Sequence, residues 1–151
     1  MMEKHFTASV YIVSKINGVK KVLLHKHKKL NIWLPVGGHI EKGETPIDAV
    51  KREAKEEANL DLFLINKSKL IKTNFVTEIT LPISILEENI PMHRNVKAHK
   101  HIDLIYVAKA KNPKKIKMEE IYGWFDLNQI KKLRLGKEVG YLARKALSFV
   151  P

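Results

Sequence analysis

Hydrophobic and polar residues alternate near the start of the chain, as is typical of a β-strand with one buried face. We predict a strand over residues 6–13 and a second over residues 19–24, joined by a turn at Asn17-Gly18. Alternate positions of the first strand form its apolar face: Phe6, Ala8, Val10 and Ile12. The two segments together predict a β-hairpin.

The next segment is short and apolar, and a pair of glycines follows it. Residues 32–35 are expected to be buried, and residues 41–44 to form a loop. Gly37 and Gly38 lack a Cβ, which allows either unusual backbone angles or the close approach of another group.

A helix is predicted to begin after this loop. Thr45 is suited to cap it, Pro46 to its first position, and Asp48 to complete a capping box. The helix should run to about Ala58, and Asn59 tolerates the left-handed conformation that commonly ends a helix. Its apolar stripe has helical spacing: Ile47, Val50, Ala54 and Ala58.

The rest of the chain mixes predicted strands with two shorter helices. The predicted strands cover residues 61–65, 70–79, 102–108 and 121–125, and the predicted helices residues 127–133 and 137–149. Residues 80–101 carry no assignable pattern. No repeat or linker is visible, so we expect one domain over residues 1–151, of mixed α/β (α+β) class.

The amino-acid composition limits which kinds of metal site and nucleophile the protein can have. The 151 residues include no cysteine, which excludes thiolate metal sites and a cysteine nucleophile. No apolar run approaches the roughly 20 residues that span a bilayer, and no apolar leader is present, so a cytoplasmic protein without membrane contact is expected.

The formal net charge of +12 suggests either an anionic partner or a solvated basic surface. Lysine supplies most of the 28 basic residues, and arginine, which suits bidentate phosphate recognition, occurs at four positions. Dispersed lysine favours the solvated surface.

Three glutamates of the predicted helix share one face. Glu53, Glu56 and Glu57 are spaced i, i+3 and i+4, and each like-charge pair costs roughly 0.2–0.5 kcal/mol on an isolated helix. Removing one charge is therefore expected to raise thermal stability slightly. A hard divalent cation such as Mg²⁺ would relieve this repulsion. Taken alone, a solvated acidic face stabilised by Lys51 and Lys55 is the simpler interpretation.

A longer motif that includes these glutamates favours a functional site over a solvated acidic face. Gly38, five residues, Glu44, seven residues and the run from Arg52 to Leu60 resemble the Nudix box, the signature of the Nudix hydrolases. The resemblance implies the family's α/β/α sandwich with a mixed sheet. Two positions depart from the motif: Asn59 replaces its final glycine, and Ala54 replaces a larger aliphatic residue.

The resemblance also implies roles for particular residues. Glu53, Glu56 and Glu57 match the family's metal-binding and catalytic glutamates. Arg52 matches the arginine that orients a box glutamate, and the carbonyl of Gly37 or Gly38 can offer the metal a further ligand. Three further positions match structural parts of the motif: Gly37, Glu44 and Asn59.

A second group of polar residues precedes the strand predicted at residues 102–108. His99, His101 and Asp103 alternate, so a strand would place all three on one face, where they could contact substrate or metal. The alternative is a set of surface polar residues. His25 and His27 could likewise meet phosphate, although a solvated turn explains them as well.

The resemblance therefore implies a Mg²⁺-dependent hydrolase, with Mn²⁺ as a substitute, that cuts a phosphoanhydride bond in a nucleoside diphosphate or triphosphate derivative. A small nucleotide is the expected substrate, and nucleic acid is disfavoured. The alternatives are an RNA 5′-end pyrophosphohydrolase and a Nudix-fold binding module without turnover. Whether the protein forms a homodimer stays open.

Overall fold

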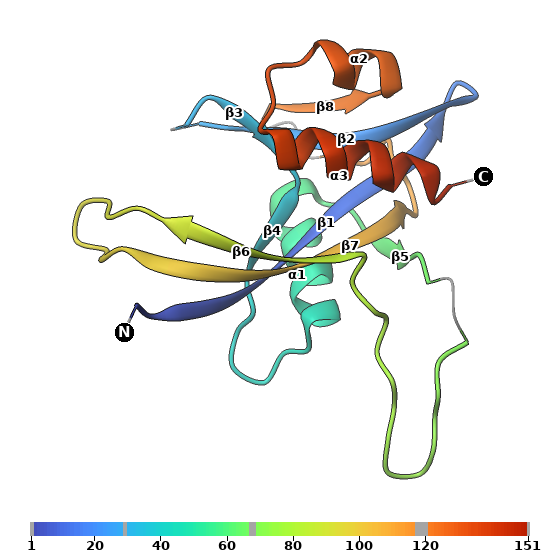
Figure 1. Ribbon diagram of the computed structural model, residues 1–151. Helices are drawn as coiled ribbons and strands as arrows, with labels where there is room; N and C mark the ends of the chain where they lie inside the picture. The colour runs from blue at the N-terminus through green and yellow to red at the C-terminus, as the bar shows by residue number, and fades with distance from the viewer. Residues whose placement is uncertain (1, 29, 67–68, 117–120, 151) are drawn as a thin grey trace.

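The computed structural model describes residues 2–28, 30–66, 69–116 and 121–150 (Figure 1). Its strands are β1 Lys4–Ile16, β2 Val19–His27, β3 Ile32–Leu34, β4 Val36–His39, β5 Leu62–Leu64, β6 Ser84–Ile90, β7 His99–Ala110 and β8 Tyr122–Phe125. Its helices are α1 Pro46–Ala58, α2 Leu127–Lys132 and α3 Lys137–Ser148. The predicted opening hairpin and all three predicted helices are confirmed.

The described strands form one mixed sheet around β1. Its main path runs β3-β2-β1-β7-β5, while β4 pairs with β1, β6 with β7 and β8 with β2. The first half of β1 pairs with β4 and the second half with β2, both antiparallel. β7 runs parallel to β1, with His5 opposite His101. This parallel pairing brings residues near the N-terminus beside the start of β7.

The two faces of the sheet have separate cores, because successive side chains of a strand point to opposite faces. Val10 packs with Ala54 of α1 on one face. Tyr11 packs with Leu142 of α3 on the other face, and α2 contributes Ile130 there. The helices therefore cover both faces of the sheet (Figure 1), which is the α/β/α sandwich that the resemblance implied.

Helix α1 begins and ends as its sequence predicts. Thr45 and Asp48 form a complete capping box, and Pro46 occupies the first helical turn. Asn59 closes the helix in the left-handed conformation, with φ at 55°, so the turn is kept without the motif's glycine. The apolar residues Val50, Ala54 and Ala58 are fully buried. These signals fix where the glutamates of the helix lie.

Two sequence predictions differ from the structure, and one gap is filled. Residues 70–79 form no strand; a single bridge joins Lys72 and Thr77 in a segment that projects from the body, with Phe75 97% exposed. Its backbone hydrogen bonds run within the segment, from Thr73 to Val76 and from Glu78 to Ile71, and no described strand pairs with it. The segment at residues 32–35 is only half-buried. Within residues 80–101, which had no assignment, β6 pairs antiparallel with β7. Among the described residues no helix is long and apolar enough to cross a membrane.

Candidate active site

The two glycines of β4 permit close packing around the start of the box. A Cβ on Gly37 would lie 2.6 Å from the carbonyl oxygen of Ala8, and a Cβ on Gly38 would collide with the Glu53 carboxylate. Both glycines have ordinary negative φ angles, since the described positive-φ glycines are Gly18 and Gly43. Close approach, and not an unusual backbone angle, therefore requires glycine at these two positions.

Arg52 connects the acidic residues of the box. Its guanidinium donates to both carboxylate oxygens of Glu44, at 2.7 and 3.0 Å. It also donates to Glu53 at 2.7 Å and to Glu56 at 3.3 Å. A further hydrogen bond, of 3.0 Å, goes to the carbonyl oxygen of His39. One side chain thus holds the loop before α1 and two glutamates of the helix in a fixed arrangement.

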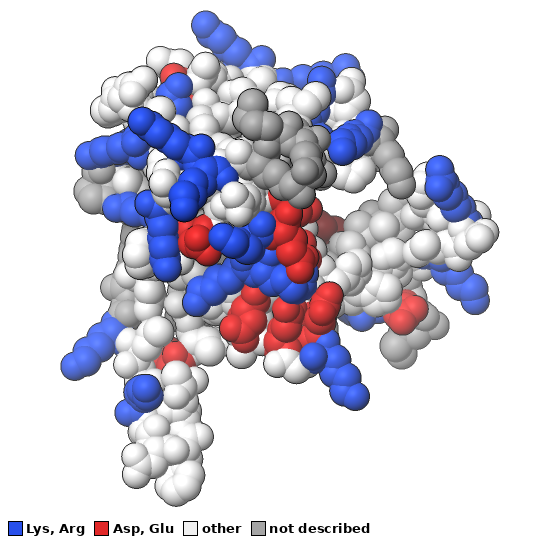
Figure 2. Space-filling view, turned by 180° about the vertical axis from the view of Figure 1, so that it is seen from behind, with Lys and Arg blue, Asp and Glu red and all other residues white. Residues whose placement is uncertain are grey.

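These contacts affect the charges and pKa values of the acidic residues on and before α1. The hydrogen bonds from Arg52 lower the pKa of Glu44, and those to Glu44 and Glu53 raise the pKa of Arg52 itself. Arg52 therefore offsets the repulsion that the spacing of the glutamates predicts. Lys55 instead pairs with Asp61 at 3.2 Å. Figure 2 shows acidic side chains gathered in the middle of the α1 side of the molecule, with basic side chains around them.

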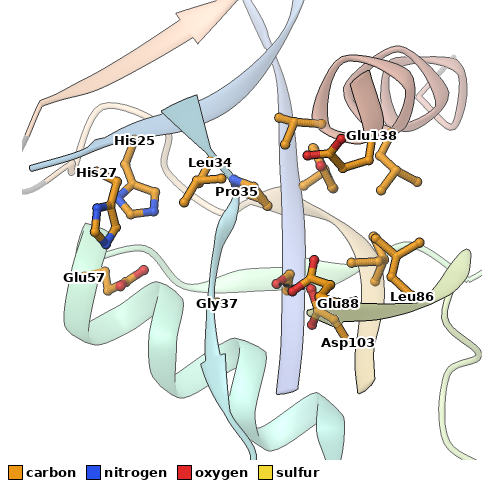
Figure 3. A pocket seen from close by; sticks show the side chains of 15 residues that line it. His25, His27, Leu34, Pro35, Gly37, Glu57, Leu86, Glu88, Asp103 and Glu138 are labelled. Carbon is orange, nitrogen blue, oxygen red and sulfur yellow. Dashed lines mark hydrogen bonds between the residues drawn. The ribbon is translucent and has the colours of Figure 1, made fainter. Parts of the chain in front are cut away.

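Glu57 lies apart from this network and lines a pocket of about 310 Å³. In Figure 3 it lies beside His25 and His27, with Gly37 and Pro35 between this end and the rest of the pocket. The hydroxyl of Tyr122 donates to the backbone carbonyl of Glu57 at 2.6 Å. This bond ties the last turn of α1 to β8 and so fixes where Glu57 enters the pocket.

The opposite end of the pocket is acidic. Glu88 of β6, Asp103 of β7 and Glu138 of α3 gather there (Figure 3). Asp103 is buried and accepts hydrogen bonds from Thr7 at 2.9 Å and Ser9 at 2.8 Å. Burial raises the pKa of Asp103, against the effect of these two bonds. Burial, with the charges of Asp103 and Glu138, also raises the pKa of Glu88.

The structure separates the three residues that the alternation at residues 99–103 groups together. All three lie on the strand face opposite α1, but Asp103 lines the pocket while His99 and His101 join two other histidines outside it. The two partners are His5 and His39. Burial and the three neighbouring imidazoles lower the pKa of His101 to about 4.

Sequence reasoning missed Glu88 and Glu138 as pocket residues. The pattern of apolar and polar residues gives no signal for β6, because its exposed positions include Ile85 and its half-buried positions include Glu88. Its pairing with β7, which turns Glu88 toward the pocket, depends on long-range register. Glu138 belongs to the first turn of a correctly predicted helix, but helical spacing does not show which cavity that turn faces.

The comparisons with known proteins agree with this geometry. The model of the NUDIX domain matches residues 5–145. The chain belongs to the Nudix family. A 64-residue segment, 39% of the chain, is 42% identical to the m7GpppN-mRNA hydrolase NUDT17 of Xenopus laevis. That match covers 21% of NUDT17, so the similarity spans about a fifth of the relative's length.

Solved Nudix structures match the chain over nearly its whole length. A NUDIX-family hydrolase from Clostridium perfringens has a TM-score of 0.79 and 34% sequence identity, covering 97% of this chain and 98% of that one. The Ap4A hydrolase of C. elegans has a TM-score of 0.62 and 26% identity, with 100% of both chains covered. The mixed sheet and its flanking helices are therefore the Nudix fold.

Proposed function

We propose that this Nudix protein hydrolyses a phosphoanhydride bond in a nucleoside diphosphate or triphosphate derivative, with a divalent cation as cofactor. The observation that carries the proposal is the arrangement of the box glutamates. Arg52 holds Glu53 and Glu56, Glu53 packs against Gly38, and Glu57 enters the neighbouring pocket. In the proposal, these residues are the catalytic and metal-binding groups.

The side chains at this place fit Mg²⁺, for which Mn²⁺ could substitute. Glu53, Glu56 and Glu57 offer carboxylate oxygens and Gly38 offers a carbonyl oxygen, which are the donors that hard cations prefer. Glu53 packs against the backbone of Gly38, so the helix and the strand that would supply these donors lie next to each other. When bound, the ion would neutralise phosphate charge and make the phosphorus more susceptible to attack by water.

A carboxylate of the pocket would accept the proton of the attacking water. Glu57 and Glu88 are the two candidates, at opposite ends of the cavity (Figure 3). The raised pKa of Glu88 favours it as a base, because proton transfer is most efficient when the pKa of the base approaches the working pH. Glu57 is favoured by its place in the box.

The pocket favours a small substrate that carries its phosphates with a cation. Its volume of about 310 Å³ is at the lower end of the range of ligand pockets, roughly 300–1,000 Å³. Glu88, Asp103 and Glu138 would repel a bare polyphosphate, so bound metal must offset their charge. The small nucleotide derivative remains the leading proposal for the substrate.

A turnover panel tests this proposal. Nucleoside triphosphates, oxidised nucleotides, nucleoside diphosphate sugars, dinucleoside polyphosphates and 5′-triphosphorylated RNA would compete at equal concentration with Mg²⁺ present. We expect phosphate, pyrophosphate or a nucleoside monophosphate to be released from a small nucleotide, and EDTA to stop the release. Inertness of the folded protein across the panel would support a binding module instead.

RNA 5′-end hydrolysis is the second candidate, favoured by the net charge of +12 and by the similarity to NUDT17. A polynucleotide that contacts many lysines should lose affinity steeply with salt, with a log-log slope of about −0.7 for each neutralised phosphate of a single strand. We expect a shallow slope. A steep slope together with a higher kcat/KM for RNA would replace the small-nucleotide proposal.

A further inference from the structure

Four histidines from three strands meet on the sheet face opposite α1. They are His5 of β1, His39 of β4, and His99 and His101 of β7. The strand register explains why they meet: His5 lies opposite His101, and Thr7, two residues further along β1, lies opposite His39. The ring centroids of neighbouring pairs are 4.5–6.1 Å apart, so the four rings form one group.

The ring nitrogens of this group are near enough to one another for one metal ion to reach them all after small movements. One nitrogen from each ring lies within 4.8 Å of the corresponding nitrogens of the other three. A tetrahedral ion with metal–nitrogen bonds of about 2.0–2.1 Å needs nitrogens about 3.3 Å apart. His99 Nε2 and His101 Nε2 are already 3.1 Å apart. His39 is exposed, which leaves its ring room to turn toward the other three.

The hydrogen bond between His99 and Lys97 directs the unprotonated ring nitrogen of His99 toward this centre. Its Nδ1 lies 2.9 Å from the carbonyl oxygen of Lys97, which can only accept, so Nδ1 carries the proton. In a neutral ring, Nε2 is then an unprotonated nitrogen directed at His101. A backbone carbonyl that fixes the tautomer in this way is the usual outer partner of a metal-bound histidine.

The position of His101 fits a metal-bound state better than a metal-free one. Without an ion, His101 Nε2 must donate its proton to His99, which leaves an unprotonated Nδ1 facing the carboxylate of Glu88 at 3.9 Å. With an ion on both Nε2 atoms, the proton of His101 moves to Nδ1 and faces that carboxylate. The bound state would therefore direct a proton of His101 toward that carboxylate.

We propose that His5, His39, His99 and His101 bind one first-row transition-metal ion, and that Zn²⁺ is the ion that fits best. Four imidazoles suit Zn²⁺, which accepts tetrahedral nitrogen donors, and they do not suit Mg²⁺, which requires oxygen. The site is separate from the box glutamates. It also stands independently of the proposed hydrolysis, because its evidence is the geometry of the histidines.

Such an ion would fasten three distant parts of the chain. It would join the start of β1 and the start of β7 to the end of β4. The carbonyl oxygen of His39 accepts the 3.0 Å hydrogen bond from Arg52, so the ion would also hold the segment that leads into the box. Four protein ligands leave no open position for a substrate, which makes the inferred role structural.

Cobalt binding provides a test with a readout other than activity. The metal-free full chain would be placed in excess Mg²⁺, which occupies oxygen sites, and titrated with Co²⁺ while visible absorption is recorded. We expect one equivalent to give the intense absorption of tetrahedral Co²⁺, and Zn²⁺ to displace it. Zn²⁺ should also raise the melting temperature of the wild-type protein.

Substitutions of the less buried ligands identify the site without threatening the fold. His5→Asn and His39→Asn should each weaken Co²⁺ affinity about ten-fold or more and reduce the thermal shift with Zn²⁺. His93→Asn, an exposed histidine outside the group, should bind like wild type. Glu56→Gln should also keep the absorption. Unchanged affinity in folded His5→Asn and His39→Asn, a six-coordinate spectrum, or loss of the signal in Glu56→Gln would each overturn the proposal.

Discussion

The glutamates of α1 and the four histidines differ in chemistry, yet they meet at one dipeptide. Gly38 faces α1 and packs against Glu53, whereas the side chain of His39, the next residue of the strand, belongs to the histidine group. The glutamates are oxygen donors, and Arg52 offsets part of their negative charge. The histidines are nitrogen donors from three strands. Their ligand types would keep Mg²⁺ and Zn²⁺ in separate places.

The two groups are also assembled in different ways. The spacing of the glutamates along α1 places them on one face of the helix, so a local change in sequence can move or remove them. The histidines depend on the register of β1 with β4 and β7. Arg52 is the link between the two, because it contacts Glu53 and Glu56 and also the backbone of His39. Substitutions on either side of this link test whether the two groups act independently.

The largest effect is expected from removing a box carboxylate. Glu56→Gln and Glu57→Gln remove a charge at nearly constant volume, so we expect kcat to fall by about 10²–10⁴-fold with the fold retained. Steady-state kinetics with the best substrate of the panel measures this change. Glu88→Gln in the same assay distinguishes the two candidate bases, since the base variant should also lose the acidic limb of the pH profile.

Asp61→Asn is the matched control for these variants. Asp61 is an exposed carboxylate just beyond the end of α1 and pairs with Lys55, away from the Arg52 network. Its loss should leave kcat within about two-fold of wild type, because surface ion pairs contribute little. If Glu57→Gln and Asp61→Asn behaved alike, the assignment of catalysis to the α1 glutamates would be wrong.

A smaller effect on turnover is expected for Arg52→Lys. Lysine keeps the charge but lacks the planar group that contacts Glu44, Glu53 and the His39 carbonyl together. We expect kcat to fall about ten-fold and the melting temperature to fall by a few degrees without metal. Mg²⁺ should recover part of that loss of stability, because it offsets the glutamate charge. Paired thermal shift and kinetic assays check both effects.

Arg144→Lys provides the control for this substitution. Arg144 is exposed on α3, so the same chemical change there should alter neither kcat nor the response to Mg²⁺. An Arg52→Lys protein with wild-type stability and turnover would show that the network does not organise the box. A Zn²⁺ shift that is lost in Arg52→Lys would show that the two groups are coupled through His39.

The sequence could predict the local features of this molecule well. Helix α1, its Thr45 cap and its end at Asn59 follow from residue preferences that act within a few positions. The Nudix box also predicted the family and its fold, because the spacing of its residues is a specific signature. From the sequence, Gly38 could serve either an unusual backbone angle or the close approach of another group. The structure shows that the close approach of Glu53 is what requires glycine there.

Features that depend on distant pairing could not be predicted in the same way. The apolar residues of 70–79 favour a strand, but none of the described strands pairs with them along their length. Residues 84–90 become β6 because β7 supplies a partner. The alternation of His99, His101 and Asp103 correctly predicts a shared face. It does not reveal that His5 and His39 complete a group with two of them, since this depends on the register of three strands.

The smallest expected effect comes from the cap of α1, which should affect the glutamate side alone. Thr45→Ala removes the 3.2 Å bond from the Asp48 amide and should cost about 1 kcal/mol of unfolding free energy at neutral pH, measured by urea denaturation. The bonds from Thr45 lower the pKa of Asp48, so the contribution of this carboxylate is complete above its ordinary value of 3.8 and is lost as the pH falls through the lowered pKa. The difference between Thr45→Ala and wild type should therefore shrink at acidic pH.

Thr77→Ala, at an exposed position outside the helices, should show no such difference. Co²⁺ affinity at the histidines should stay unchanged in Thr45→Ala, because among the described residues no hydrogen bond or ion pair joins the histidine group to Thr45 or Asp48. A parallel loss of Co²⁺ binding would show that α1 and the histidine group form one cooperative unit.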